Sequence, residues 1–120
     1  MSQEGKTFGQ VLRECRIAKG FSLRKFAEMV GVSPTYLSQV EQNKVEKPPT
    51  AERVRRMAEL LDANADEWSA MADRVPEDLP GIIKKQPTQM PELLREASGL
   101  SPEQLKQLIA KIRRTKEKDQ

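Results

Sequence analysis

The stretch from residue 31 to residue 44 constrains this chain most, because it joins a turn signal to the start of a helix. Gly31 can take a left-handed backbone at little cost. Ser33 is a favoured N-cap, and Pro34 is a favoured first helical residue, since the N–H that proline lacks would have no partner there. The stretch therefore predicts a tight turn followed by a short helix. One side of that helix carries Leu37, Val40 and Glu41.

The remaining surface of this helix carries hydroxyl and amide side chains, namely Thr35, Tyr36, Ser38, Gln39 and Gln42. Side chains of this kind can donate hydrogen bonds to base edges in a DNA major groove and accept hydrogen bonds from them. Whether the helix can reach a groove depends on the helices that precede and follow it.

Helical periodicity surrounds this stretch on both sides. Apolar residues recur at spacings of three and four, which is the spacing of one helix face. The pattern predicts helices at 8–19, 23–30, 34–42, 51–62 and 65–73. Because their connections are short, we expect them to form one compact all-α domain at 7–73, with Cys15 and Trp68 in its core.

The composition changes after residue 73. Residues 74–89 contain three prolines and a glycine, which favours a linker over a long helix. Two more helices are expected within 90–116, the first at 90–97 and the second capped by Ser101. The sequence therefore predicts an all-α chain in which a C-terminal helical hairpin follows the first domain.

This predicted hairpin carries more apolar surface than it can bury by itself. An exposed apolar stripe of this size needs a partner surface. The partner can be the same hairpin in a second chain, the first domain, or another protein. The apolar residues expected at this interface are Leu93, Leu94, Leu105, Leu108, Ile109 and Ile112.

The composition narrows the classes of function. Histidine is absent and cysteine occurs once, which argues against imidazole catalysis, a disulfide framework and a cysteine-based zinc site. No apolar run approaches the roughly 18 residues of a membrane span. The formal net charge of +3 permits a nucleic-acid partner without requiring one. We expect a cytoplasmic protein with no metal and no cofactor.

A more specific pattern surrounds the turn. It consists of Gly20-x-Ser22, Ala27, Gly31-Val-Ser and Tyr36-Leu37-Ser38-x-x-Glu41. The run resembles the Cro-type helix-turn-helix of the XRE family of phage and bacterial repressors, over about residues 7–73. The resemblance implies a five-helix, lambda-repressor-like DNA-binding domain. The layout, with its short C-terminal hairpin for dimerisation, is similar to that of Sin-type biofilm repressors.

The resemblance also implies roles for single residues. The family's buried ion pair between the first helix and the end of the third falls on Arg16 and Glu41, where it fixes geometry. Base reading falls on Thr35 and Gln39, with Ser38 nearby, and Gln39 can pair with adenine through two hydrogen bonds. Phosphate anchoring is expected from the residues that bracket the third helix, which are Ser22, Arg24, Lys25, Tyr36, Asn43, Lys44 and Lys47.

These observations predict a sequence-specific transcriptional regulator that acts as a repressor. It is expected to bind double-stranded DNA at a two-fold operator as a homodimer. The alternative is an antitoxin or repressor component whose C-terminal hairpin is controlled by a protein partner, either an antirepressor or a protease. An enzyme is not expected, because the chain has neither a histidine nor a glycine-rich phosphate loop.

Overall fold

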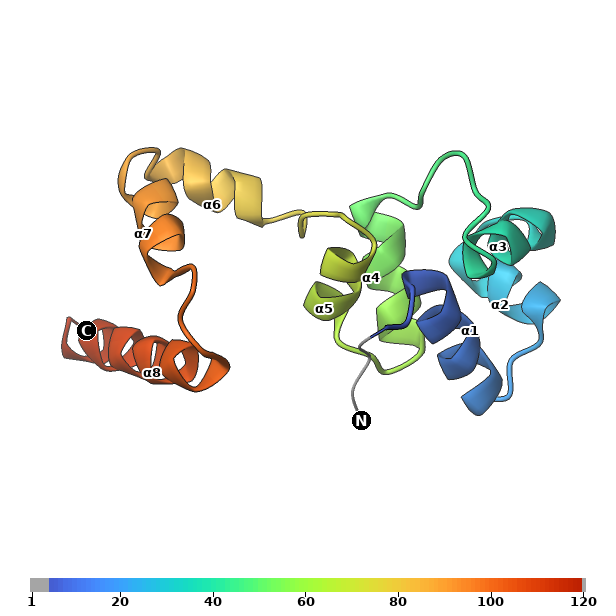
Figure 1. Ribbon diagram of the computed structural model, residues 1–120, viewed down its shortest axis with the longest axis horizontal. Coiled ribbons are helices and arrows are strands. Elements are labelled where there is room, and N and C mark those ends of the chain that lie inside the picture. Colours follow the sequence, from blue (N-terminus) through green and yellow to red (C-terminus); the bar gives the residue numbers. More distant parts are fainter. Residues whose placement is uncertain (1–4, 120) are drawn as a thin grey trace. The chain divides into compact units, whose positions relative to one another are not determined.

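The computed structural model describes residues 5–119, and these residues form eight α-helices and no strand (Figure 1). The chain divides into two compact units, of which the first ends at Leu79 and the second begins at Pro80. The predicted all-helical fold class is therefore confirmed. The helices are α1 (Phe8–Ala18), α2 (Leu23–Val30), α3 (Pro34–Glu41), α4 (Ala51–Leu60), α5 (Ala65–Met71), α6 (Leu79–Lys85), α7 (Gln89–Ala97) and α8 (Pro102–Lys118).

Side-chain caps start the helices of the first unit, because each cap satisfies an N–H group that has no partner inside the helix. At α1 the cap is a reciprocal capping box, in which Thr7 Oγ1 accepts from the Gln10 N–H at 3.2 Å and Gln10 Oε1 accepts from the Thr7 N–H at 2.9 Å. One hydroxyl or amide oxygen caps each of the next four helices. These capping residues are Ser22, Ser33, Thr50 and Asn64.

The core of the first unit is mostly aliphatic and contains two aromatic pairs, Phe8–Trp68 and Phe21–Phe26. Helix α3 packs on α1 and α2, and α4 packs on α2 and α5. The rings of Phe8 and Trp68 meet edge to face with centroids 5.6 Å apart, which confirms Trp68 as a core residue. Cys15 packs at the edge of this core, where burial raises the pKa of its thiol. The largest fully buried side chains are Phe26, Leu12, Leu37, Met57, Val11 and Val54.

The segment 74–89, for which the sequence predicts a linker, contains the helix α6. Pro80 is compatible with this helix because it is the second helical residue, where an N–H would have no partner inside the helix. Helix α8 continues to Lys118, beyond the predicted end of the hairpin at residue 116. Lys116 and Lys118 lie in its last turn, where cations suit the helix dipole.

The second unit has no core of its own among the residues that the structure describes. None of the described residues of α7 and α8 is buried, and the same holds for α6. Helix α8 nevertheless begins as predicted, with a capping box between Ser101 and Gln104. Helix α7, by contrast, starts without a side-chain cap, and the helices of this unit leave their apolar faces open.

Candidate nucleic-acid interface

Helices α2 and α3 are joined by a turn that depends on Gly31. This residue has φ of 89°, and its N–H donates to Ala27 O at 2.9 Å. The Val32 N–H donates to the same carbonyl at 3.0 Å, which ends α2 in a paired turn. Ala27 is fully buried, as a side chain at a close helix crossing must be. Ser33 then caps α3, because its Oγ accepts from the Tyr36 N–H at 3.0 Å.

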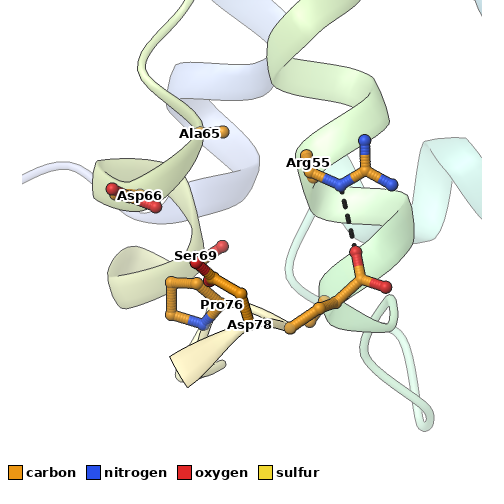
Figure 2. A pocket seen from close by; sticks show the side chains of 8 residues that line it. Arg55, Ala65, Asp66, Ser69, Pro76 and Asp78 are labelled. Carbon is orange, nitrogen blue, oxygen red and sulfur yellow. Dashed lines mark hydrogen bonds and ion pairs between the residues drawn. The ribbon is translucent and has the colours of Figure 1, made fainter. Parts of the chain in front are cut away.

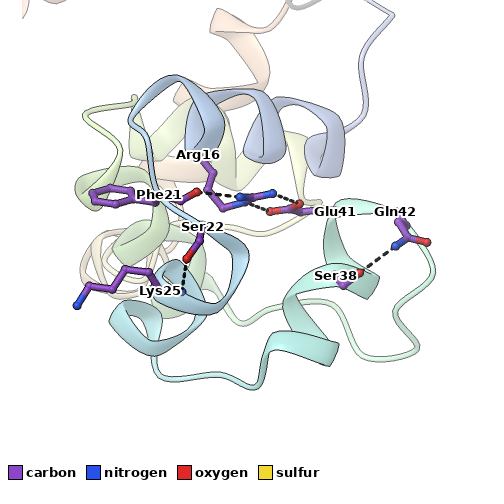
Figure 3. A network of polar contacts seen from close by, with 7 residues as sticks. All are labelled: Arg16, Phe21, Ser22, Lys25, Ser38, Glu41 and Gln42. Carbon is purple, nitrogen blue, oxygen red and sulfur yellow. Dashed lines mark hydrogen bonds and ion pairs between the residues drawn. The ribbon is translucent and has the colours of Figure 1, made fainter.

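A buried ion pair connects α1 to the end of α3 (Figure 3). Arg16 Nε donates to Glu41 Oε2 at 2.7 Å, and Arg16 Nη2 donates to Glu41 Oε1 at 3.0 Å. A third donor of the same guanidinium, Nη1, reaches the Phe21 carbonyl at 2.9 Å. Because the pair is bidentate and buried, it fixes both the distance and the rotation of α3 against α1.

Gly9 lets these two helices approach closely, and the sequence analysis did not identify it. A Cβ at this position would lie 2.3 Å from Val40 O and 2.7 Å from Glu41 O, both of which are backbone atoms. Only glycine therefore fits between α1 and the end of α3. The available signal was a glycine inside an otherwise helical pattern, which often marks a packing requirement.

The outward face of α3 presents the predicted base-reading residues. Thr35 and Gln39 are exposed, and Ser38 is partly exposed. Ser38 Oγ accepts from Gln42 Nε2 at 2.9 Å, so Ser38 can still donate its own hydroxyl hydrogen (Figure 3). This face can both donate hydrogen bonds to base edges and accept hydrogen bonds from them.

A hollow of about 470 Å³ lies between α3 and the loop that follows it. It brings together the predicted base reader Gln39 and the predicted phosphate contacts Tyr36, Lys44 and Lys47. In the described part of the chain, neither lysine forms an ion pair, so both charges face solvent. An anion can therefore approach this side of α3 without breaking an existing contact.

Three of the other predicted phosphate contacts, Ser22, Arg24 and Lys25, lie at the start of α2. Arg24 and Lys25 are exposed there, next to the first N–H groups of the helix. Ser22 Oγ accepts from the Lys25 N–H at 3.0 Å, which leaves the Ser22 hydroxyl hydrogen free to donate (Figure 3). The cations and the positive end of the helix dipole together favour a phosphate at this point.

Tyr36 and Asn43 already have partners within the domain. The Tyr36 hydroxyl donates to the Lys47 carbonyl at 2.8 Å, and burial raises the pKa of Tyr36. A phenol has one hydrogen to donate, so a direct phosphate contact would require it to leave this carbonyl. Asn43 Nδ2 donates to Thr7 Oγ1 at 2.7 Å, and Asn43 ends α3 with φ of 60°. Its second amide hydrogen can still donate.

The predicted interface residues of α7 and α8 lie on the surface of the second unit. Leu94 is 56% exposed and Ile109 is 46% exposed, which are high values for aliphatic side chains. Leu108 is partly buried. The other exposed members of the set are Leu93, Leu105 and Ile112.

Neither a metal-ligand cluster nor a membrane-spanning helix occurs in residues 5–119. This part of the chain contains no group of three or more acidic, cysteine or histidine side chains placed to hold a metal ion. It also contains no helix that is long and apolar enough to cross a membrane.

Comparison with known proteins gives matches to a family, to a curated relative and to solved structures. Residues 12–68 match the helix-turn-helix family. The transcriptional regulator SinR of Bacillus subtilis (strain 168) is 26% identical over 103 residues, which cover 84% of this chain and 87% of SinR.

Two solved structures are also similar. One is the crystal structure of SinR, described as the master regulator for biofilm formation, in complex with DNA. It is 31% identical over 52% of this chain and 97% of its own, with a TM-score of 0.47. The other is the complex of SinR with SinI, which is 25% identical over 92% of this chain and 99% of its own, with a TM-score of 0.48.

Proposed function

We propose that the chain is a member of the Cro/XRE-type helix-turn-helix family of DNA-binding transcriptional regulators, and that it is a repressor that binds a two-fold operator as a homodimer. The observation that carries the proposal is the presentation of α3. Its inner side is held by the Arg16–Glu41 pair, while Thr35 and Gln39 are exposed on its outer side. A rigid helix with a polar outer face suits direct reading of a major groove.

In this proposal the residues divide into base readers and phosphate contacts. Gln39 forms two hydrogen bonds with one base, and Thr35 contacts a thymine methyl or a base edge, with Ser38 as a further donor. Lys44 and Lys47 bind phosphate on one side of α3, while Ser22, Arg24 and Lys25 bind phosphate at the start of α2. Asn43 contributes its free amide hydrogen. Tyr36 acts on the loop through Lys47.

The dimer forms through the second unit. In this proposal the open apolar faces of α7 and α8 pair with the same faces of a second copy, as a two-fold interface requires. Two copies of the first unit would then place their α3 helices in successive major grooves, with half-sites about one helical turn, roughly 34 Å, apart. We place such a regulator in the cytoplasm, where it has access to DNA.

A mobility-shift measurement with DNA from the upstream region of its own gene tests this function. A shuffled duplex of the same composition serves as the matched control. The proposal expects retarded complexes at moderate salt with the first DNA and much weaker retardation with the control. Equal retardation of both DNAs would refute sequence-specific regulation.

A second candidate is supported by the same open faces. A regulator controlled by a protein partner, such as an antirepressor or an antitoxin-type complex, would have α7 and α8 covered by another protein. Light scattering of the purified full chain distinguishes this candidate function from the homodimeric repressor. A clean homodimer supports self-association, whereas a monomer that copurifies with a stoichiometric partner supports the second candidate.

A further inference from the structure

Three consecutive carbonyls in the loop after α3 accept hydrogen bonds from two different elements. The Tyr36 hydroxyl, on α3, donates to the first of them, Lys47 O, at 2.8 Å. Arg74, which follows α5, donates to the other two, with Nη2 at 3.0 Å from Pro48 O and Nε at 2.9 Å from Pro49 O. Helix α3, the proposed recognition helix, and the end of the first unit are therefore connected through this one loop.

The contacts from Tyr36 and Arg74 supply the hydrogen bonds of the loop, while Val45 packs against the core and Pro49 is buried. Pro48 and Pro49 have no N–H and cannot donate backbone hydrogen bonds. In the described part of the chain, the contacts from Tyr36 and Arg74 are the hydrogen bonds that hold residues 45–49. The planar guanidinium matches two adjacent carbonyls, a geometry that a lysine ammonium reproduces poorly.

Arg74 is itself fixed from both sides. Its own N–H donates to Ser69 O at 2.7 Å. Three residues later, Glu77 Oε1 accepts from Arg55 Nε at 3.0 Å, which anchors the chain on α4 (Figure 2). Residues 76–78 also line a pocket of about 270 Å³ together with α4 and α5. The partly buried Arg74 side chain is thus positioned to hold the loop.

The loop carries residues on which DNA binding is proposed to depend. Lys47 belongs to the loop, and Lys44 begins it, where its N–H donates to Gln39 O at 2.9 Å. The hollow beside α3 is lined by the same two lysines and by Gln39. A shift of the loop would therefore change where these charges lie relative to the base-reading face.

We propose that Arg74 is a positioning residue for DNA binding, which sets the loop beside the recognition helix and makes no contact with DNA itself. The inference rests on the proposed function. A positioning residue differs from a phosphate contact in a measurable way. A phosphate contact contributes to the salt dependence of binding, and a positioning residue does not.

The test uses the full chain and a duplex that the wild-type protein selects from a randomised library. Arg74→Lys keeps the charge but loses the paired donors. It is expected to bind the selected duplex roughly tenfold more weakly, with the wild-type slope of log affinity against log salt. Arg13→Lys, the same replacement at an exposed arginine of α1 that has no part in holding the loop, is expected to bind as the wild type does. If Arg74→Lys kept wild-type affinity, or if Arg74→Ala lowered the slope by about one, the inference would be wrong.

Tyr36→Phe supplies a second test, because it removes the other contact to the loop and leaves Arg74 in place. It is expected to weaken binding without changing the salt slope. The double variant, Tyr36→Phe with Arg74→Lys, is expected to lose less affinity than the product of the two single fold-changes, since both residues act on one loop. If the effects of the two replacements on affinity multiplied, the two residues would act independently. That result would contradict the inference even if Arg74→Lys lowered the stability of the fold. A wild-type chain that did not prefer the selected duplex over a shuffled one would instead refute the proposed function.

Discussion

Arg16 and Glu41 form a bidentate ion pair that joins the last turn of α1 to the last residue of α3, with both side chains buried. Removing one partner would leave a buried charge without compensation. Glu41→Gln is therefore expected to lower the free energy of unfolding by about 3–5 kcal/mol. Arg16→Met combined with Glu41→Leu should restore most of it, because no buried charge remains. Denaturant unfolding measures both, and a Glu41→Gln variant of wild-type stability would contradict this role.

Gly9 gives the second prediction. In Gly9→Ala the new methyl group would meet the backbone oxygens of Val40 and Glu41, so α1 and α3 must move apart. We expect a loss of about 1–3 kcal/mol, as for other overpacked sites. Gly81→Ala is the matched control, since a Cβ there meets nothing within 4 Å. The prediction fails if the melting temperatures of the two variants change equally.

Gln39 and Lys44 are expected to contribute to DNA binding in different ways. Gln39→Ala should reduce affinity for the selected duplex and relax sequence preference, because it removes a contact to a base. Lys44→Ala should weaken binding to all duplexes alike and lower the salt slope by about one. Titrations with selected and shuffled DNA at several salt concentrations measure both effects. Identical behaviour of the two variants would overturn the assignment.

Leu108 tests the proposed dimer interface. Leu108→Glu places a charge on the apolar face of α8 and is expected to produce a monomer in light scattering. The first unit should keep its folded signal, since its core lies within its own helices. Gln107→Glu, which adds the same charge at the exposed neighbouring position, should remain dimeric. A dimeric Leu108→Glu variant would show that α8 is not the interface.

Tyr36 gives a prediction for alkaline pH. Burial raises the pKa of this phenol in the folded state, while nearby Arg53 and Arg74 oppose the shift. The Tyr36 phenol then holds its proton more tightly in the folded state than in the unfolded state. This difference stabilises the fold fully below the ordinary pKa of about 10, and the stabilisation is lost as pH rises through the pKa of the folded state. Because Tyr36 is the only tyrosine, absorbance titration reports it directly. A midpoint at or below the ordinary value would contradict the prediction.

Local signals explain why much of the fold could be predicted. The caps at Thr7, Ser22, Ser33 and Ser101 depend on one side chain and on N–H groups within the same turn. The turn at Gly31 is local in the same sense. Such features can be identified without knowledge of the tertiary structure, and the structure contains them.

Features that depend on distant residues could not be predicted in this way. Gly9 is needed because of backbone atoms more than thirty residues away, and no local pattern encodes that approach. Arg74 begins the predicted linker, and its role depends on the carbonyls of Pro48 and Pro49, which are distant in the sequence. A count of prolines does not predict helix α6, because the position of each proline decides its effect and Pro80 lies where a helix tolerates it.

In the candidate site, too, some features depend on nearby residues and others depend on distant ones. The exposure of Thr35 and Gln39 follows from the helical period of α3. The hydrogen bond that occupies the Tyr36 hydroxyl depends on the path of a loop rich in proline. The sequence therefore predicted which face of α3 is outward, but not which of its polar groups were already paired.

The most direct test of the central claim is a hydroxyl-radical footprint of the full chain on a duplex selected from a randomised library. A dimer that places two α3 helices in successive major grooves should protect two segments. Their centres should lie about one helical turn, roughly 34 Å, apart, and their sequences should be related by a two-fold axis. A single protected segment, or uniform cleavage along the duplex, would contradict the proposal that this chain recognises a two-fold operator as a dimer.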